Sequence, residues 1–378
     1  MSYKQVLKRF ILSFPSFREK YKNKLIASGK FQKYENHVAG LESANKVFIP
    51  DAIKDSIGLI GLVKDAVFEY DEDYISTRSY FPKYERFFKN NNLLFEYYDI
   101  LASDWMEKAE KFDSIIWHTD SDPITQEIAQ NKIYVLDKLM GKKCLPSFDE
   151  IWSYENKINA HYCFKFYDLP EIPTYVSHSE RDVGAYLDSI SYPLISKLST
   201  GSASFGVEKI DSKTNAKKML EKVFGFKGRE TYFPTVRQKD YVYFQEFMDD
   251  ATYDLRIVTI GDKAFGYYRL PQAGDFKASG SGIYEKKEIP KEALDLAFQV
   301  YDKFGSVCLA TDLLYSEKRK QFFIIESSIF IGVDTDEQLV VNGEPGVYIR
   351  TDNKYRFERG KFWIQELTMR EFFERATK

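Results

Sequence analysis

The 378-residue sequence is poor in the features that would give an extracellular, metal-stapled or membrane-spanning structure. Its three cysteines, Cys144, Cys163 and Cys308, lie far apart, without the paired spacing of a zinc site or the even number of a disulfide framework. No apolar run approaches the roughly 20 residues that cross a bilayer, and no N-terminal stretch resembles a signal peptide. We therefore expect a cytoplasmic protein without integral membrane contact.

The chain also has no excess of one charge. Lys and Arg number 54 against 57 Asp and Glu, which gives a net charge of −3 without a long block of one sign. Nothing in this balance requires a nucleic acid, so we expect none as a partner. The first 14 residues, MSYKQVLKRFILSF, fit either an amphipathic helix packed on its own domain or one lying on an anionic membrane surface.

Strands and helices alternate in the first half of the chain. Apolar segments that predict strands lie at 57–63, 93–100, 114–119 and 142–147, and helical segments lie between them. This spacing is typical of βαβ units and predicts a parallel sheet, in which ligands bind at the carboxyl ends of the strands. His118, Asp120 and Asp122 follow one such strand end. They either touch a substrate or a metal, or serve as ordinary turn and helix-cap residues.

From Glu155 onward the pattern becomes antiparallel. Alternating segments at 253–262 and 263–271 predict a hairpin that turns at Gly261–Asp262, and a periodic helix ends at Gly305. Segments 308–316 and 321–330 predict a second strand pair.

A loop of small residues, STGSASFG at 199–206, interrupts this part of the chain. Such a loop lets backbone N–H groups approach an anion closely. It is not a Walker loop, because Val207 and Glu208 stand where Lys and Ser or Thr are required, and Ala203 breaks the dinucleotide pattern. Just before the loop, Lys197 lies in apolar surroundings, where its ammonium either meets an anion or reaches out to solvent.

Two carboxylates, Asp312 and Glu326, stand singly in the apolar segments of the second strand pair. If these strands pair, both side chains reach one face and suit a hard cation such as Mg²⁺. The alternative is a salt bridge across the sheet to Arg256 or Arg269.

The order of these motifs resembles the ATP-grasp superfamily, and most closely its RimK-like carboxylate–amine ligases. The resemblance rests on ENKINAHY, PLISKL, the small-residue loop, QEFM, YDLRIVTIGDKAFGYYR, GDFKASGSG, ATDLL and IIESS, and covers residues from about 57 to 333. It implies an α/β fold in which a parallel pre-ATP-grasp domain precedes two α+β subdomains that sandwich ATP. The domains expected are an N-terminal helical extension (1–50), the pre-ATP-grasp domain (51–150), a small subdomain with a lid loop (151–244), a large subdomain (245–335) and a C-terminal extension (336–378).

The resemblance also implies site residues for ATP and two Mg²⁺ ions. Nucleotide-binding positions are Lys157, Lys197, the lid residues Ser202, Ala203, Ser204 and Phe205, the hinge residues Gln245, Glu246, Phe247 and Met248, and Asp254 for the ribose. Catalytic positions are Arg269 and Lys277. Metal ligands are Asp312, Glu326 and Ser328, although the family usually has Asn where this sequence has Ser328, which weakens the second metal site.

The reaction implied is transfer of the γ-phosphoryl group of ATP to a substrate carboxylate, followed by attack of an amine on the acyl phosphate. An amino acid, a short peptide or an acidic sugar fits as substrate, and a homodimer is left open. Two alternatives also stay open. One is an ATP-grasp kinase that stops after phosphorylation, and the other is a nucleotide-binding module with impaired catalysis.

Overall fold

The computed structural model describes residues 14–65, 73–201, 206–231, 233, 236–352 and 354–376. Its first part contains α2 (Pro15–Ala27), β1 (Phe31–Lys33), α3 (Tyr34–Gly40), the 3-10 turn η1 (Leu41–Ser43), α4 (Asp51–Lys54), β2 (Ile60–Val63), β3 (Tyr74–Ser76), α5 (Phe81–Asn91), β4 (Phe95–Tyr97), α6 (Trp105–Ala109), β5 (Ser114–Trp117), α7 (Pro123–Ile133), the π-helical turn η2 (Tyr134–Leu139), β6 (Lys143–Leu145) and α8 (Phe148–Ser153).

Four of these strands form the parallel sheet expected from the sequence, in the order β4-β2-β5-β6. The strands are short and apolar, and every residue of β2 and β5 is buried because helices cover the sheet. The helical segment between the first two predicted strands is α5, which begins at Phe81, where Asp65 accepts a hydrogen bond from the Tyr80 N–H and Pro82 fits the first helical turn.

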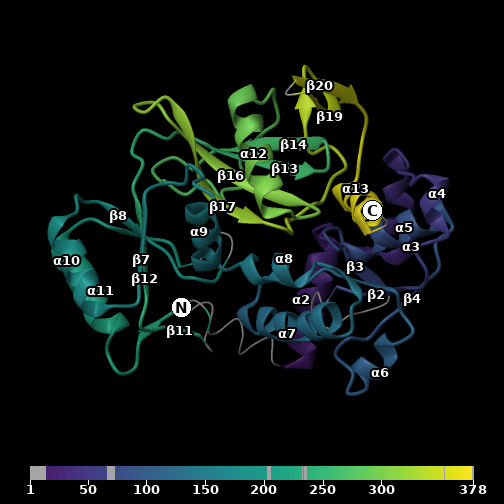
Figure 1. Cartoon of the computed structure of the whole chain (residues 1–378), viewed down its shortest axis with the longest axis horizontal. Coiled ribbons are helices and arrows are strands. Elements are labelled where there is room, and N and C mark those ends of the chain that lie inside the picture. Colours follow the sequence, from purple (N-terminus) through teal and green to yellow (C-terminus); the bar gives the residue numbers. More distant parts are fainter. Residues whose placement is uncertain are drawn as a thin grey trace.

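A second, antiparallel sheet follows in the order β7-β12-β8-β9. Its elements are α9 (Lys157–Phe166), β7 (Thr174–Ser177), α10 (Glu180–Ser189), β8 (Leu194–Ser196), β9 (Glu208–Ile210), α11 (Lys213–Val223), the short pair β10 (Arg229–Glu230) and β11 (Arg237–Gln238), and β12 (Val242–Glu246). Helices α10 and α11 bury their apolar faces on this sheet and share a small core with it, which includes Val183, Leu220 and Phe244. This unit lies at one end of the molecule, at the left in Figure 1.

The third sheet has eight strands, in the order β17-β16-β13-β14-β19-β18, with β15 paired to β14 and β20 to β19. Its elements are β13 (Asp254–Ile260), β14 (Lys263–Arg269), β15 (Tyr284–Glu285), α12 (Lys291–Phe304), β16 (Leu309–Ser316), β17 (Gln321–Ser328), β18 (Val340–Val341), β19 (Glu344–Thr351), β20 (Lys354–Arg359) and the last helix, α13 (Ile364–Ala376). Both predicted hairpins are present. The sheet continues past residue 335, so part of the predicted C-terminal extension belongs to it.

Helix α13 joins the parallel-sheet unit to the eight-stranded sheet. It packs against α5 on one side and β13 on the other, as Figure 1 shows near the C-terminus. A continuous core runs through both units, from Leu41 and Ile60 to Phe265 and Phe373. These two units therefore form one body, whereas the β7-β12-β8-β9 sheet has a core of its own. Within the described residues no helix combines the length and apolar character that crossing a membrane requires.

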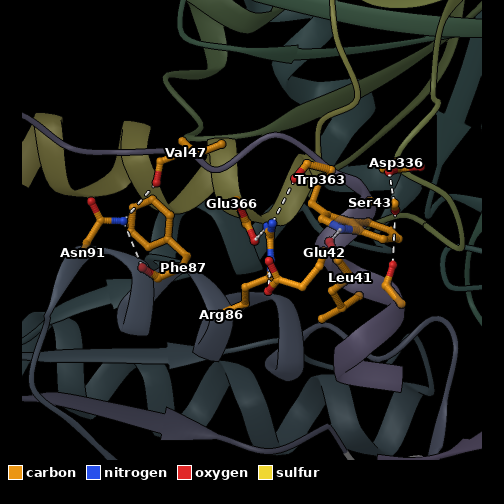
Figure 2. Close-up of polar contacts among 12 residues, drawn as sticks. Leu41, Glu42, Ser43, Val47, Arg86, Phe87, Asn91, Asp336, Trp363 and Glu366 are labelled. Carbon is orange, nitrogen blue, oxygen red and sulfur yellow. Dashed lines mark hydrogen bonds and ion pairs between the residues drawn. The ribbon is translucent and has the colours of Figure 1, made fainter. Parts of the chain in front are cut away.

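A buried ion pair fixes this junction (Figure 2). Arg86 of α5 binds the carboxylate of Glu366, which is fully buried in α13. The Arg86 Nε donates to Oε1 of Glu42 at 3.1 Å. The Arg86 Nη2 donates to the Ala44 carbonyl at 2.9 Å. Burial raises the pKa of Glu366 to about 7, and the Arg86 charge opposes that rise.

Neighbouring hydrogen bonds extend the junction along the segment before α4. The Trp363 indole donates to the Leu41 carbonyl at 3.1 Å, and Ser43 donates to Asp336 at 2.8 Å. The Asn91 side chain donates to the Val47 carbonyl at 3.0 Å. All three contacts are visible in Figure 2, and they bind segments that are distant in sequence.

Replacement of Arg86 should destabilise the protein through this junction. Arg86→Met leaves the Glu366 carboxylate buried without its partner, so we expect the free energy of unfolding to fall by about 3–5 kcal/mol. Adding Glu366→Leu should recover most of that loss, since both charges are then gone. Arg356→Met, which removes an exposed pair with Glu358, should cost no more than about 1 kcal/mol. Denaturant titration gives the free energy of unfolding of wild type and of the three variants. Equal losses for Arg86→Met and Arg356→Met would contradict a stabilising role for the buried pair.

Candidate functional site

A cavity of about 310 Å³ lies between the β7-β12-β8-β9 sheet and the eight-stranded sheet. Its volume is that of a small-molecule site. Its lining comes from both sheets, from the first residue of α9 and from the loop after β14. The predicted site residues that line it are Lys157, Lys197, Gln245, Glu246, Phe247, Met248, Asp254, Arg269, Lys277, Asp312 and Glu326.

Lys157 connects the two walls of the cavity. It is the first residue of α9, whose N-cap Asn156 accepts a hydrogen bond from Asn159. The buried Nζ lies 2.9 Å from Oε1 of Glu326 in β17 and donates to the Gly201 carbonyl at 2.5 Å. The Lys157 N–H donates to Ser199 at 2.7 Å. The lysine therefore binds the start of the small-residue loop to the opposite sheet.

Lys197 follows directly after β8 and is 6% exposed. Its backbone N–H continues the sheet by donating to Tyr243 at 3.0 Å. Among the described residues its Nζ has no ion-pair partner. Burial lowers the pKa of Lys197 to about 8, although the charge of Glu326 acts in the opposite direction. A buried ammonium in this situation favours an anion in the cavity.

Arginine and aspartate side chains alternate across three adjacent strands. The Arg256 guanidinium binds Asp312 through two hydrogen bonds of 2.7 Å, Nε to Oδ1 and Nη2 to Oδ2. Arg269 donates to Oδ2 of Asp312 and to Oδ1 of Asp254, both at 2.5 Å. Strand register makes this possible, since Asp254 lies opposite Arg269, and Arg256 opposite Asp312. The sequence left Arg256 and Arg269 as alternative partners, and the structure uses both.

The ionisation of these aspartates differs. Burial disfavours the charge on Asp312, but Arg256 and Arg269 outweigh it and hold the pKa of Asp312 well below its usual range. Burial raises the pKa of Asp254 to about 6, against the opposing effect of Arg269. Asp312 thus stays charged at neutral pH and binds both guanidinium groups, of which that of Arg269 lines the cavity.

Glu155 is a site residue that the sequence analysis missed. It is 8% exposed, its backbone adopts a left-handed φ of 52°, and one of its oxygens is buried without a hydrogen-bond partner in the described ranges. Burial raises the pKa of Glu155 to about 7. Together with Lys157 and Glu326 it lines a second, much smaller pocket. Its position just before a helix gave no signal beyond that of an ordinary polar residue.

The four predicted hinge residues take different positions. The Gln245 side chain turns into its own sheet, where it donates to Thr174 at 2.9 Å, and its backbone lies in β12 between β7 and β8. Glu246 pairs with Arg319. Phe247 and Phe276 meet edge to face with ring centroids 5.7 Å apart, and so connect the hinge to the loop after β14. Met248 is buried.

The remaining predicted site residues differ in whether they line the cavity. Lys277 lines the cavity from the loop after β14. Ser328 does not line it, and its hydroxyl donates to the Phe330 carbonyl at 2.6 Å. The lid residues Ser202, Ala203, Ser204 and Phe205 lie outside the described residues.

Asp122 caps α7, with Oδ1 accepting from Ile124 at 3.0 Å, which favours the structural alternative for that residue. Asp120 accepts a hydrogen bond from the adjacent Ser121 N–H at 2.8 Å. His118 instead faces Asp65, at the end of a neighbouring strand.

The donors present suit a hard cation, with one condition. Asp312 and Glu326 are register partners on β16 and β17 and offer carboxylate oxygens. Both already bind cationic side chains, and within the described ranges no three His, Cys, Asp or Glu side chains gather to hold a metal by themselves. A divalent ion therefore fits here only together with an anionic ligand that offsets the added charge.

Comparison with known proteins identifies this part of the chain. Residues 155–340 match the model of the RimK-like ATP-grasp domain family. The α-aminoadipate–LysW ligase LysX of Saccharolobus solfataricus is 24% identical over 255 residues, which are 64% of this chain and 84% of that protein.

Two solved structures support the fold. An ADP complex of N5-carboxyaminoimidazole ribonucleotide synthetase has a TM-score of 0.50 at 11% identity, over 81% of this chain and 83% of that one. D-cycloserine synthetase DcsG has a TM-score of 0.51 at 13% identity, over 72% of this chain and 91% of that one. The family match and the LysX match confirm the predicted RimK-like resemblance and ligase class, and the two structures confirm the ATP-grasp fold.

Proposed function

Residues 155–340 form a RimK-like ATP-grasp domain, and on that premise we propose that this chain is an ATP-dependent carboxylate–amine ligase that works through an acyl phosphate. The observation that carries the proposal is the arrangement around one cavity of the buried Lys157 and Lys197 with the Arg269–Asp312 pair. This cavity offers a polyphosphate buried cationic side chains that are held in place, one of which, Lys197, has no ion-pair partner among the described residues.

Each side chain has a role that follows from its place. Lys157 and Lys197 bind the phosphates of ATP, and the segment from Gln245 to Met248, which lines the cavity, faces the adenine. Asp254 lines the cavity for the ribose hydroxyls. The lid function proposed for Ser202 to Phe205 rests on the resemblance alone.

Arg269 and Lys277 stabilise the charge of the transferred phosphoryl group and of the acyl phosphate. Arg269 is pre-oriented by two aspartates and therefore needs little rearrangement during the reaction. Asp312 and Glu326 would hold Mg²⁺, which supplies charge neutralisation at the phosphates when it is bound. Ser328 would join them only after leaving the Phe330 carbonyl.

The carboxylate substrate we propose is an amino acid or the terminal acid of a short peptide, with an acidic sugar as the other candidate. LysX, the similar ligase, carries α-aminoadipate in its name. An amine then attacks the acyl phosphate, and the products are an amide, ADP and phosphate.

Hydroxylamine trapping tests the acyl phosphate. With ATP, Mg²⁺ and hydroxylamine, we expect a hydroxamate from at least one member of a panel of the twenty amino acids, glutamyl peptides and uronic acids. A kinase that phosphorylates an alcohol releases ADP without hydroxamate, and an impaired module binds ATP without releasing ADP. Either result would contradict the ligase proposal.

Glu326→Gln tests the metal and phosphate assignment. The substitution keeps the shape of the side chain but removes its charge, so we expect hydroxamate formation to fall by roughly 100-fold or more. Glu317→Gln, an exposed change in the turn of the same hairpin, should leave the rate unchanged. Undiminished turnover in Glu326→Gln would exclude it as a metal ligand.

The pH dependence of ATP binding tests Lys197. Its ammonium is charged below a pKa of about 8, so affinity should be constant below that pH and fall by up to tenfold per pH unit above it. Lys197→Arg stays charged over this range and should abolish the decline. Lys217→Arg, an exposed change on α11, should retain it. Calorimetric titration with ATP at pH values from about 6.5 to about 9.5, on both sides of this pKa, measures the affinity. An unchanged decline in Lys197→Arg would assign it to another group.

A further inference from the structure

The loop between β14 and β15 brings to the cavity an aromatic side chain to which no role has been given. Phe276 lines the cavity and is 39% exposed. Its ring meets that of Phe247 edge to face, with centroids 5.7 Å apart and planes at 89°. Phe247 also lines the cavity and follows directly after β12. The contact therefore joins the hinge segment of one sheet to a loop of the other.

Hydrogen bonds within this loop fix its course. The Gln272 side chain donates to the Ser281 carbonyl at 3.1 Å and so crosses the loop. Next to Phe276, the Asp275 N–H donates to the Gln272 carbonyl at 2.9 Å, and the Lys277 N–H donates to Oδ1 of Asp275 at 3.1 Å. The ring of Phe276 is therefore presented to the cavity by a loop with turns of its own.

A lysine ammonium lies near each of the two rings. Nζ of Lys209, in β9, is 4.4 Å from the centroid of Phe247, and Nζ of Lys277 is 5.7 Å from that of Phe276. The ring quadrupole attracts a cation at such distances. Phe276 thus contacts both the hinge segment and Lys277, the side chain proposed to face the transferred phosphoryl group. One aromatic residue connects these two parts of the proposed site.

The arrangement of the two rings limits where a nucleotide base can lie. Because Phe247 and Phe276 stand almost perpendicular and in direct contact, no flat base inserts between them. A base bound along the hinge segment is instead flanked by Phe276, which lines the same end of the cavity. The exposed part of the ring then exchanges water for the apolar surface of the base, which is favourable.

We propose that Phe276 is a positioning residue for ATP, which covers the adenine together with Phe247 and thereby sets the loop that carries Lys277. This inference rests on the proposed function, which places the adenine along residues 245–248. The group recognised is the flat base and not the phosphates. A polyphosphate without a base leaves Phe276 uncovered and does not hold the loop. Recognition of the base is in this way linked to the placement of Lys277 at the phosphoryl group.

Comparison of ATP with inorganic tripolyphosphate, which has no base, tests the proposal. Calorimetric titration with Mg²⁺, without carboxylate or amine, gives the affinity for each. We expect Phe276→Ala to weaken ATP binding by roughly tenfold and tripolyphosphate binding by less than about twofold. Phe276→Tyr keeps the ring and should bind ATP within about threefold of wild type. Phe226→Ala, which removes a ring that is 96% exposed after α11, should change neither affinity.

The maximal rate tests the link to Lys277. At saturating ATP, Phe276→Ala should still lower hydroxamate formation by roughly tenfold, because Lys277 is no longer held in place. Phe276→Tyr should restore most of that rate. A normal maximal rate in Phe276→Ala would exclude the link.

The binding results are decisive without any turnover. Equal weakening of ATP and tripolyphosphate in Phe276→Ala would indicate a merely structural role, and unchanged ATP binding would also overturn the proposal. Wild type that binds tripolyphosphate as tightly as ATP, or binds no ATP, would show that the base is not recognised. Wild type that binds ATP but forms no hydroxamate counts against the ligase function alone, and the two affinities then still decide whether Phe276 covers the base.

Discussion

The concentration of buried cations at one cavity is the constraint on which the rest of this structure depends. Lys157, Lys197 and Arg269 are each less than 10% exposed, and an unpaired charge in that environment is costly. The protein offsets two of these charges with carboxylates, Glu326 for Lys157 and Asp312 for Arg269, and leaves Lys197 for a ligand. The uncompensated charge of Lys197 is the feature on which the proposed binding of a polyphosphate rests.

The two walls of the cavity belong to units that are supported differently. Asp254, Arg269 and Asp312 lie on adjacent strands of the eight-stranded sheet, whose core is continuous with that of the parallel-sheet unit. The Arg86–Glu366 pair and α13 bind these units together. The sheet that carries Lys197 has a separate core, and such a unit is suited to close over a ligand and reopen for product release.

Local sequence patterns predicted much of this arrangement. Alternation of apolar residues gave the hairpin of β13 and β14, and the turn at Gly261 needs a positive φ, which is 59°. A single lysine among apolar residues indicated Lys197.

Other features depend on partners distant in sequence. The tail after residue 335 gave no sign that β19 would pair with β14, and the ion pairs of Asp312 depend on the register of three strands. Glu155 lines a small pocket with Glu326, which is distant in sequence, so its position could not be read from its neighbours in the chain.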